Sequence, residues 1–246
     1  MNYGLGILTP VDWLALGWFI LSWAGYTIFA RWQARHRPCL HNQLAEHRRH
    51  WVRQIVSHEM RITDATCLGI LQRNVSFFAS TTIFIIGGLL TVMGATERAI
   101  ELVSALPMVG DSSRAVWEIK LLLLVMVYIY AFFKFTWSMR QYNFAVVLLG
   151  GAPFRREIGE AEQPFIESTS QVMTRANTSF NMGLRAYNFA MAGLAWFIQP
   201  WLFILTSTLV VIVLYRREFR SGAMYALQIA AQGQRAETVR DPVQTP

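Results

Sequence analysis

The side chains best suited to ion chemistry form a polar stripe within the largely apolar C-terminal half of the chain. Asn181, Arg185 and Asn188 are three or four residues apart, and this spacing places them on one face of a helix. Thr174 and Thr178 extend the same face toward the N-terminus. A guanidinium group flanked by amides can bind an anion or line a path for ions. The alternative is the solvated face of a cytoplasmic helix, and the sequence leaves both open.

Lysine and arginine residues next to other apolar runs could join this stripe. Lys134 lies inside an apolar run, where a charged side chain either reaches the interface or faces a protein interior or an aqueous path. Lys120, closer to the start of the same run, is expected to extend to the membrane interface. Arg73 and Asn74 precede another apolar run. We predict that they line the cytoplasmic mouth of a pore.

All five histidines fall in one basic segment, residues 31–73. His47 and His50 are three residues apart and could share a metal ion. Further ligands would have to come from His36, Cys39 or His41. No pair has a recognised ligand spacing, so we favour a basic segment that faces lipid headgroups. A response to pH stays open because histidine titrates near pH 6.5. We predict neither a metal site nor a cofactor.

Four apolar runs position these side chains: residues 11–30, 77–94, 117–139 and 194–214. Each approaches or reaches the roughly 20 residues that a helix needs to cross the hydrocarbon core. Of the 246 residues, 54% are hydrophobic and only 15% are charged, whereas an average soluble domain has roughly 25% charged residues. The composition predicts an all-α, polytopic integral membrane protein with four transmembrane helices.

Two of these helices are expected to extend into the cytoplasm as long, continuous helices, over residues 42–76 and 164–193. Pro164 suits the first turn of the second one. Pro200, further along, removes one helix hydrogen bond and exposes the carbonyl of Trp196. This predicts a kink whose freed carbonyl must be bound by a neighbour. Residues 1–228 would form a single helical membrane domain, followed by a polar tail at 229–246.

Small residues recur along one edge of the second long helix. They are Ala176, Ser179, Gly183, Ala186, Ala190 and Gly193. Such an edge lets another helix backbone approach closely. A similar stripe precedes and enters the apolar run at 77–94. Because two such seams exceed what four spans in one chain require, we predict a homo-oligomer.

The net charge of +7 comes almost entirely from arginine. The start of the chain has no basic residue and no cleavable signal peptide is expected, whereas residues 31–73 are rich in arginine. We therefore predict an N-terminus outside, in a bacterial inner membrane. With four spans, the arginines of the C-terminal tail would lie outside, against this rule. An odd number of spans, with Pro200 at the apex of a re-entrant hairpin, would remove the conflict.

The arginines of the basic segment are expected to bind the headgroups of anionic lipids. The residues assigned to this role are Arg31, Arg35, Arg37, Arg48 and Arg49.

Three stretches carry a resemblance to a known family. They are residues 71–74 (LQRN) leading into 80–82 (STT), the run 120–143 with its SMRQYN ending, and residues 183–187 (GLRAY) followed by the span that ends at Tyr215. Through them, from about residue 10 to 220, the chain resembles the domain-of-unknown-function 599 family of bacterial and plant membrane proteins. The resemblance implies four spans and no established activity, and it includes no catalytic motif.

The function predicted from these features is a small homo-oligomeric channel or transport pore, passing anions because arginine is in excess. The alternative is a membrane scaffold or accessory subunit that binds anionic lipid or a partner protein. No enzymatic activity is expected, since the spans contain no paired carboxylates and no histidine, and the chain has no Gly-rich phosphate loop. The basic charge is attributed to topology and lipid contact, and no binding of nucleic acid is expected.

Overall fold

The computed structural model describes residues 8–36, 39–57, 62–104, 113–152 and 161–240, and all regular elements in these ranges are helical. The elements are α1 (Pro10–His36), α2 (Leu40–Ser57), α3 (Ile62–Gly94), α4 (Thr96–Ser104), α5 (Arg114–Gly150), α7 (Glu162–Leu194), the 3₁₀ turn η2 (Ala195–Phe197), α8 (Pro200–Phe219) and α9 (Gly222–Arg240). The all-α prediction is confirmed for the described part of the chain.

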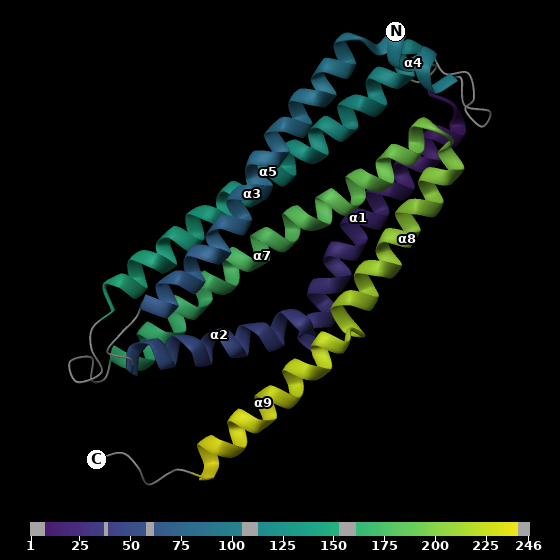
Figure 1. Ribbon diagram of the computed structural model, residues 1–246. Helices are drawn as coiled ribbons and strands as arrows, with labels where there is room; N and C mark the ends of the chain where they lie inside the picture. Colours follow the sequence, from purple (N-terminus) through teal and green to yellow (C-terminus); the bar gives the residue numbers. More distant parts are fainter. Residues whose placement is uncertain (1–7, 37–38, 58–61, 105–112, 153–160, 241–246) are drawn as a thin grey trace.

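The long helices form two groups that lie side by side (Figure 1). The first group is α3, α5 and α7, in which α5 packs along both of the others. The second group is the antiparallel pair α1 and α8. At one end of the bundle α2 crosses from the first group to the second, and α9 packs against it. At the opposite end lies the short helix α4, near the start of α5.

Three helices in the described ranges are long and apolar enough to cross a membrane: Pro10–Ala34, Ile62–Gly94 and Arg114–Gly150. They contain the first three predicted spans. The predicted fourth span, 194–214, does not form one continuous helix, because the chain leaves helical geometry between Leu194 and Pro200. The predicted count of four is therefore not reproduced.

The end of α7 is a reversal of the chain, whereas the sequence predicts a kinked but continuous helix. Gln199 is extended, with φ −154° and ψ 144°, and Pro200 begins α8. Both follow from proline: its ring disfavours helical geometry in the preceding residue, and its missing N–H costs nothing at a first helical position. α8 then returns along α7, so that the Thr206 hydroxyl donates to the Ala192 carbonyl at 3.2 Å. Pro200 thus lies at the apex of a helical hairpin.

Other predicted boundaries also need correction. The first long cytoplasmic helix is divided, since α2 ends at Ser57 and α3 begins at Ile62. The connection after the second span contains α4, and the C-terminal tail is helical as far as Arg240. The end of α5 at Gly150 agrees with the glycine pair at that position.

The seam of small residues on α7 packs against α5 of the same chain. All six seam residues are buried. The Ser138 hydroxyl of α5 donates to the Ala176 carbonyl at 2.7 Å, and the Ser179 hydroxyl donates to Gln141 at 3.0 Å. At Gly183 the closest neighbour is the buried ring of Phe135. The seam therefore joins two helices within one chain, and it leaves no edge of α7 for a second copy.

The close approach at Gly183 can be tested by adding a side chain. A Cβ atom there would lie 2.5 Å from the nearest carbon of the Phe135 ring. Because this ring is fully buried, Gly183→Val should lower the free energy of unfolding by about 1–3 kcal/mol. Gly87→Val is the matched control, since a Cβ on Gly87 meets no atom within 4 Å. Thermal unfolding in detergent that is equal for both variants would contradict the packing described here.

The second predicted seam lies mostly on the outer surface of α3. Ala65, Ser80 and Gly87 are exposed. Gln72 and Ser76 do contact α5, where the Gln72 amide donates to Asn143 at 2.6 Å and the Ser76 hydroxyl lies 3.3 Å from the Met139 sulfur. Only part of this stripe therefore serves helix packing within the chain.

Candidate functional site

Three layers of side chains follow one another along the interface between the two helix groups. The first is a buried polar group near the start of α1, here called the outer lock. The Trp196 indole donates to the Asp12 carboxylate at 2.8 Å, and the same carboxylate accepts bonds from the Thr9 backbone and hydroxyl at 3.2 and 2.6 Å. The Lys120 ammonium donates to the Trp196 carbonyl at 2.8 Å. The outer lock thereby joins α1, α5 and η2.

Lys120 does not extend to the interface as predicted, since it is only 3% exposed. Its position follows from the chain reversal, which frees the carbonyl of Trp196 from helical pairing, as the sequence predicts for Pro200. The ammonium group binds that carbonyl and lies 5.5 Å from the centre of the Trp196 ring. Lys120 also interacts electrostatically with Asp12. A buried lysine is tolerated here because a carbonyl, a ring face and a carboxylate surround it.

The second layer is an aromatic cluster, here called the aromatic layer. Phe19 packs edge-on against Phe189 at 5.8 Å and obliquely against Phe203 at 5.0 Å. Trp23 stacks on Phe189 at 6.0 Å, and Trp196 stacks on Phe203 at 5.1 Å. These rings come from α1, α7, η2 and α8, and Phe19, Phe189 and Phe203 are fully buried. The aromatic layer fills the space between the helix groups.

The third layer, here called the basic cluster, is Arg31 of α1, Lys134 of α5 and Arg185 of α7. Tyr130 lies among them: its ring centre is 5.3 Å from the Lys134 ammonium, and its phenol interacts electrostatically with both arginines. Tyr130 also packs edge-on against Trp23 of the aromatic layer at 5.3 Å. Lys134 and Arg185, which the sequence singles out from separate segments, therefore lie around one tyrosine.

Arg185 is the most enclosed arginine of the basic cluster. Its side chain is 18% exposed, its guanidinium lies 5.3 Å from the centre of the Tyr26 ring, and its closest carboxylate oxygen belongs to Glu218 at 3.9 Å. Glu218 also accepts a hydrogen bond from the backbone N–H of His41 at 3.3 Å. A single carboxylate thus faces three cationic side chains. The cluster keeps a net positive charge that suits an anion.

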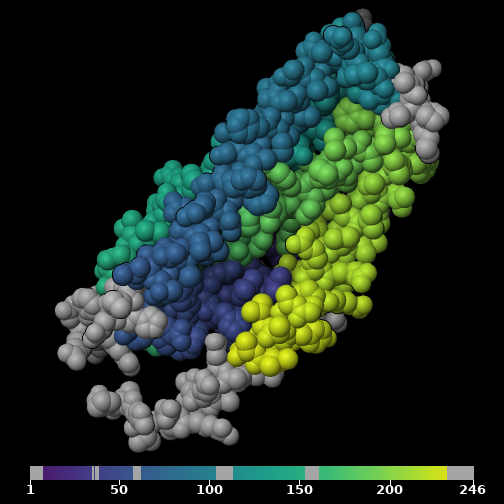
Figure 2. Space-filling model, viewed as in Figure 1, coloured from purple at the N-terminus to yellow at the C-terminus, as the bar shows by residue number. Residues whose placement is uncertain are grey.

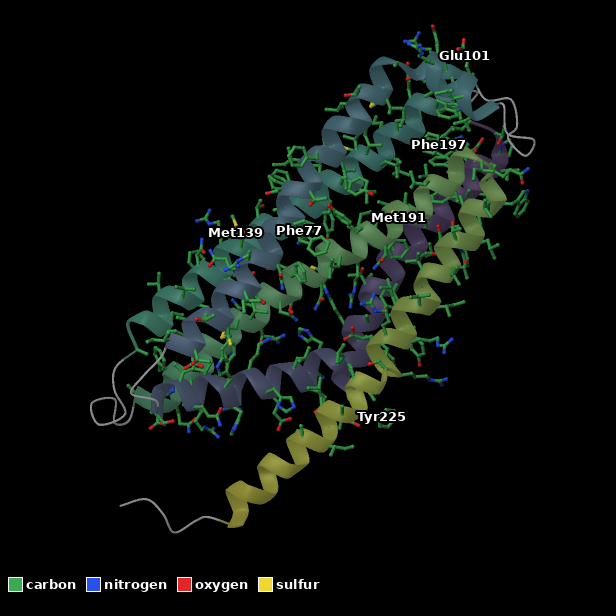
Figure 3. The ribbon with its side chains drawn as sticks, in the orientation of Figure 1. Phe77, Glu101, Met139, Met191, Phe197 and Tyr225 are labelled. Atoms are coloured by element: carbon green, nitrogen blue, oxygen red, sulfur yellow. The ribbon has the colours of Figure 1, made fainter. Side chains whose placement is uncertain are left out.

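The layers occur in the same order on every helix that contributes to them. Along α1 the order is Asp12, then Phe19, then Arg31, and along the antiparallel α7 it is Arg185, then Phe189, with Trp196 in η2. The side chains between the two helix groups, including many nitrogen atoms, appear in Figure 3. The space-filling view shows a recess between α3 and α8–α9, with α2 at its base (Figure 2). We call this hollow the recess.

A polar pocket of about 680 Å³ lies between α2 and α7. Arg49 of α2 and Glu167 of α7, both in its lining, form an ion pair at 2.8 Å. Nearby on these helices, Arg48 and Asn177 each have a buried side-chain nitrogen without a hydrogen-bond partner among the described residues. Burial lowers the pKa of Arg48, and it also lowers the pKa of His41, assisted by the charge of Arg48. The start of α7 therefore offers unused donors.

Most other residues of the predicted pore lie where the α7 stripe leads. Asn181 and Asn188 are half-buried on α7, one turn before and one turn after Arg185. Arg73 and Asn74 do not join them, because both are exposed on α3, and neither has a hydrogen bond or ion pair with a described residue. The proposed cytoplasmic mouth at Arg73 and Asn74 is therefore not part of the basic cluster.

The arginines expected at lipid headgroups contact the protein instead. Arg31 lies 3.8 Å from the Met182 sulfur, Arg49 pairs with Glu167, and Arg48 is largely buried near Tyr142. The side chains of Arg35 and Arg37 lie outside the described residues.

The histidines of the basic segment do not gather. No group of three or more metal-ligating side chains occurs within the described ranges. His47 contacts the Leu227 carbonyl of α9 at 3.1 Å, and His36 contacts the Trp32 carbonyl at 2.9 Å. Cys39 is fully buried, and burial raises the pKa of its thiol. His58 lies outside the described residues.

Together these features define a helical protein with three helices suited to a membrane and an enclosed basic cluster between two helix groups. A family model with the description "Protein of unknown function, DUF599" matches residues 14–223, and the chain belongs to this family. The match includes α1 to α8, and it excludes the first residues of α1 and most of α9. Neither a curated protein nor a solved structure matches the chain.

Proposed function

We propose that this protein is a transport pore for small anions whose path runs between the two helix groups of one chain. The observation that supports it best is the basic cluster, in which side chains from α1, α5 and α7 place three cations around Tyr130. Glu218 is the carboxylate paired with this cluster. The buried, unpaired donors of Arg48 and Asn177 add to its capacity for an anion.

The three layers have the order expected of a pore closed at one end. The recess leads toward the basic cluster, and the aromatic layer and the outer lock lie beyond it. Asp12 and Arg31 are 19 positions apart on α1, a rise of about 28 Å, close to the roughly 30 Å of hydrocarbon in a bilayer. The outer lock and the basic cluster would then lie near opposite membrane surfaces. An anion would pass only after the aromatic layer parts.

The α7–α8 hairpin supports an odd number of membrane crossings, by α1, α3, α5, α7 and α8. It brings Glu218 at the end of α8 beside His41 of α2, so the C-terminal arginines share one end of the bundle with the basic segment. Among the described residues, Arg98 and Arg114 lie at the other end, where they flank α4 and the start of α5. With the arginine-rich end in the cytoplasm, the N-terminus is outside and the C-terminus is inside.

Reporter fusions test this topology in bacterial cells. Green fluorescent protein, which matures only in the cytoplasm, should fluoresce when fused after Pro246, and alkaline phosphatase at that position should be inactive. Fusions truncated after Gly110 should give the reverse pair of results. An active phosphatase after Pro246 would contradict the odd count and restore the four-span arrangement.

The function itself is tested by flux from liposomes that contain the purified protein. Chloride or nitrate should leave protein-containing vesicles faster than empty ones, and potassium should not, because the cationic cluster repels it. The predicted homo-oligomer is not needed for this path, since the α7 seam is used within the chain. Equal rates with and without protein would be evidence for the non-transporting scaffold instead.

A further inference from the structure

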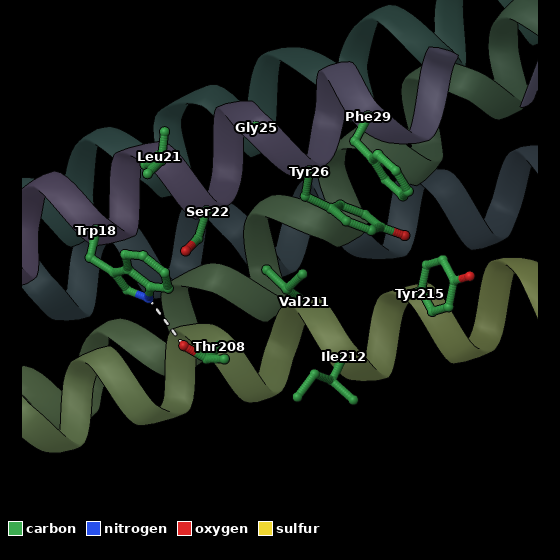
Figure 4. Close-up of a pocket in the computed structure, with 10 residues that line it drawn as sticks. All are labelled: Trp18, Leu21, Ser22, Gly25, Tyr26, Phe29, Thr208, Val211, Ile212 and Tyr215. Atoms are coloured by element: carbon green, nitrogen blue, oxygen red, sulfur yellow. Dashed lines mark hydrogen bonds between the residues drawn. The ribbon is translucent and has the colours of Figure 1, made fainter. Parts of the chain in front are cut away.

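An apolar groove runs along the outer surface between α1 and α8 (Figure 4). It has a volume of about 500 Å³. Its lining residues are Trp18, Leu21, Ser22, Gly25, Tyr26, Phe29, Thr208, Val211, Ile212 and Tyr215. Nearly all of the lining surface is apolar, and on α1 it lies within the candidate span Pro10–Ala34. The groove therefore faces the hydrocarbon of the bilayer if α1 crosses it.

The dimensions of the groove fit one acyl chain. Trp18 and Phe29 mark its ends on α1, which are separated by a rise of about 17 Å, close to half of the roughly 30 Å hydrocarbon thickness. A hydrogen bond from the Trp18 indole to the Thr208 hydroxyl, 3.0 Å long, joins the helices at the end nearer the membrane centre. At the other end Phe29 and Tyr215 pack with their ring centres 6.2 Å apart.

The cytoplasmic end of the groove carries positive charge. Arg216 is exposed and lies four positions after Ile212, so it continues the groove-lining face of α8 by one turn. A basic residue at the cytoplasmic surface attracts anionic lipid headgroups. An apolar groove one leaflet long that ends at an arginine has the charge and shape of an anionic phospholipid.

We propose that this groove is a binding site for an anionic phospholipid of the cytoplasmic leaflet, with one acyl chain between α1 and α8 and the headgroup phosphate at Arg216. The chain would pack on Tyr26, whose ring also contacts the Arg185 guanidinium. The site does not depend on transport. It requires only that α1 and α8 lie in the membrane.

The test uses native mass spectrometry of the full-length protein titrated with dioleoyl phosphatidylglycerol or dioleoyl phosphatidylcholine. A Cβ on Gly25 or on Gly17 meets no atom within 4 Å, but only Gly25 lies in the groove. Gly25→Phe should weaken binding of phosphatidylglycerol about tenfold, because the ring takes the place of apolar lipid atoms. Gly17→Phe, on the same helix, is the matched control and should bind as the unmodified protein does.

The headgroup contact is tested with Arg216→Gln. This variant should lose roughly fivefold of the preference for phosphatidylglycerol over phosphatidylcholine, while Arg140→Gln, an exposed arginine on α5, should keep it. If Gly25→Phe binds phosphatidylglycerol as Gly17→Phe does, the groove holds no specific lipid and the proposal is wrong. Equal affinity for the two lipids in the unmodified protein would likewise overturn the anionic site, whatever the result of the flux assay.

Discussion

Lys120→Met should be the most destabilising of the single substitutions considered for this protein. It removes the donor to the Trp196 carbonyl and the cation nearest Asp12, so that a carboxylate and a carbonyl remain buried without it. Breaking a buried ion pair from one side costs about 3–5 kcal/mol. For a chain of this size we expect the midpoint of thermal unfolding in detergent to fall by roughly 10 °C.

The double variant Lys120→Met/Asp12→Asn separates charge from packing. If the cost comes from the uncompensated carboxylate, neutralising Asp12 should restore part of the lost stability. Lys134→Met is the matched control, since Lys134 is half-buried and its ammonium lies over Tyr130. A cation–π contact of this kind contributes about 0.5–1 kcal/mol. Equal melting of the two lysine variants would contradict the account of the outer lock.

Arg185→Gln should have the largest effect on transport. The substitution removes the most enclosed cation of the basic cluster and leaves Glu218 without its arginine partner. Charge-assisted hydrogen bonds contribute about 1.5–3 kcal/mol, which corresponds to a loss of roughly 10- to 100-fold in anion flux. The measurement is chloride efflux from liposomes at matched protein content.

Two further variants make this result interpretable. Arg185→Lys keeps the positive charge and should retain more flux than the glutamine variant. Arg140→Gln removes an exposed arginine, whose guanidinium lies 5.8 Å from the Trp137 ring centre, and should leave flux unchanged. Thermal unfolding of each variant shows that it is folded. A folded Arg185→Gln protein with normal chloride flux would exclude the basic cluster from the path.

The helices and their packing edges could be predicted from local sequence, because apolar length and small-residue spacing act within one helix. The seam on α7 is an example: all six predicted residues are buried. Its partner could not be predicted, since α5 comes from a different part of the chain. The choice of α5 depends on Phe135, Ser138 and Gln141, which fit the edge that the seam presents.

The reversal at Pro200 was accessible to sequence analysis, but as one of two readings of the same proline. A proline can kink a helix or begin a new one, and the outcome depends on the preceding residue. Here Gln199 is extended, so a new helix begins. The freed Trp196 carbonyl was predicted, whereas its partner Lys120 was assigned to the interface. Its burial depends on Asp12, an acidic residue next to an apolar run that could have served as a signal.

The candidate site was only partly predictable. Arg185 and Lys134 stand out as charges within or beside apolar runs, and both belong to the basic cluster. Tyr26 and Glu218 were missed, because a tyrosine in a span and a glutamate among arginines carry no distinctive pattern. They are brought to Arg185 by the hairpin and by the pairing of α1 with α8.

The most direct test of a path within one chain is the number of copies needed to empty a vesicle. Liposomes of uniform size are prepared over a range of protein densities, and the fraction that releases its chloride is measured. If one chain suffices, this fraction should follow the Poisson probability that a vesicle holds at least one copy. A curve that requires two or more copies per vesicle, or no release at any density, would contradict the proposal.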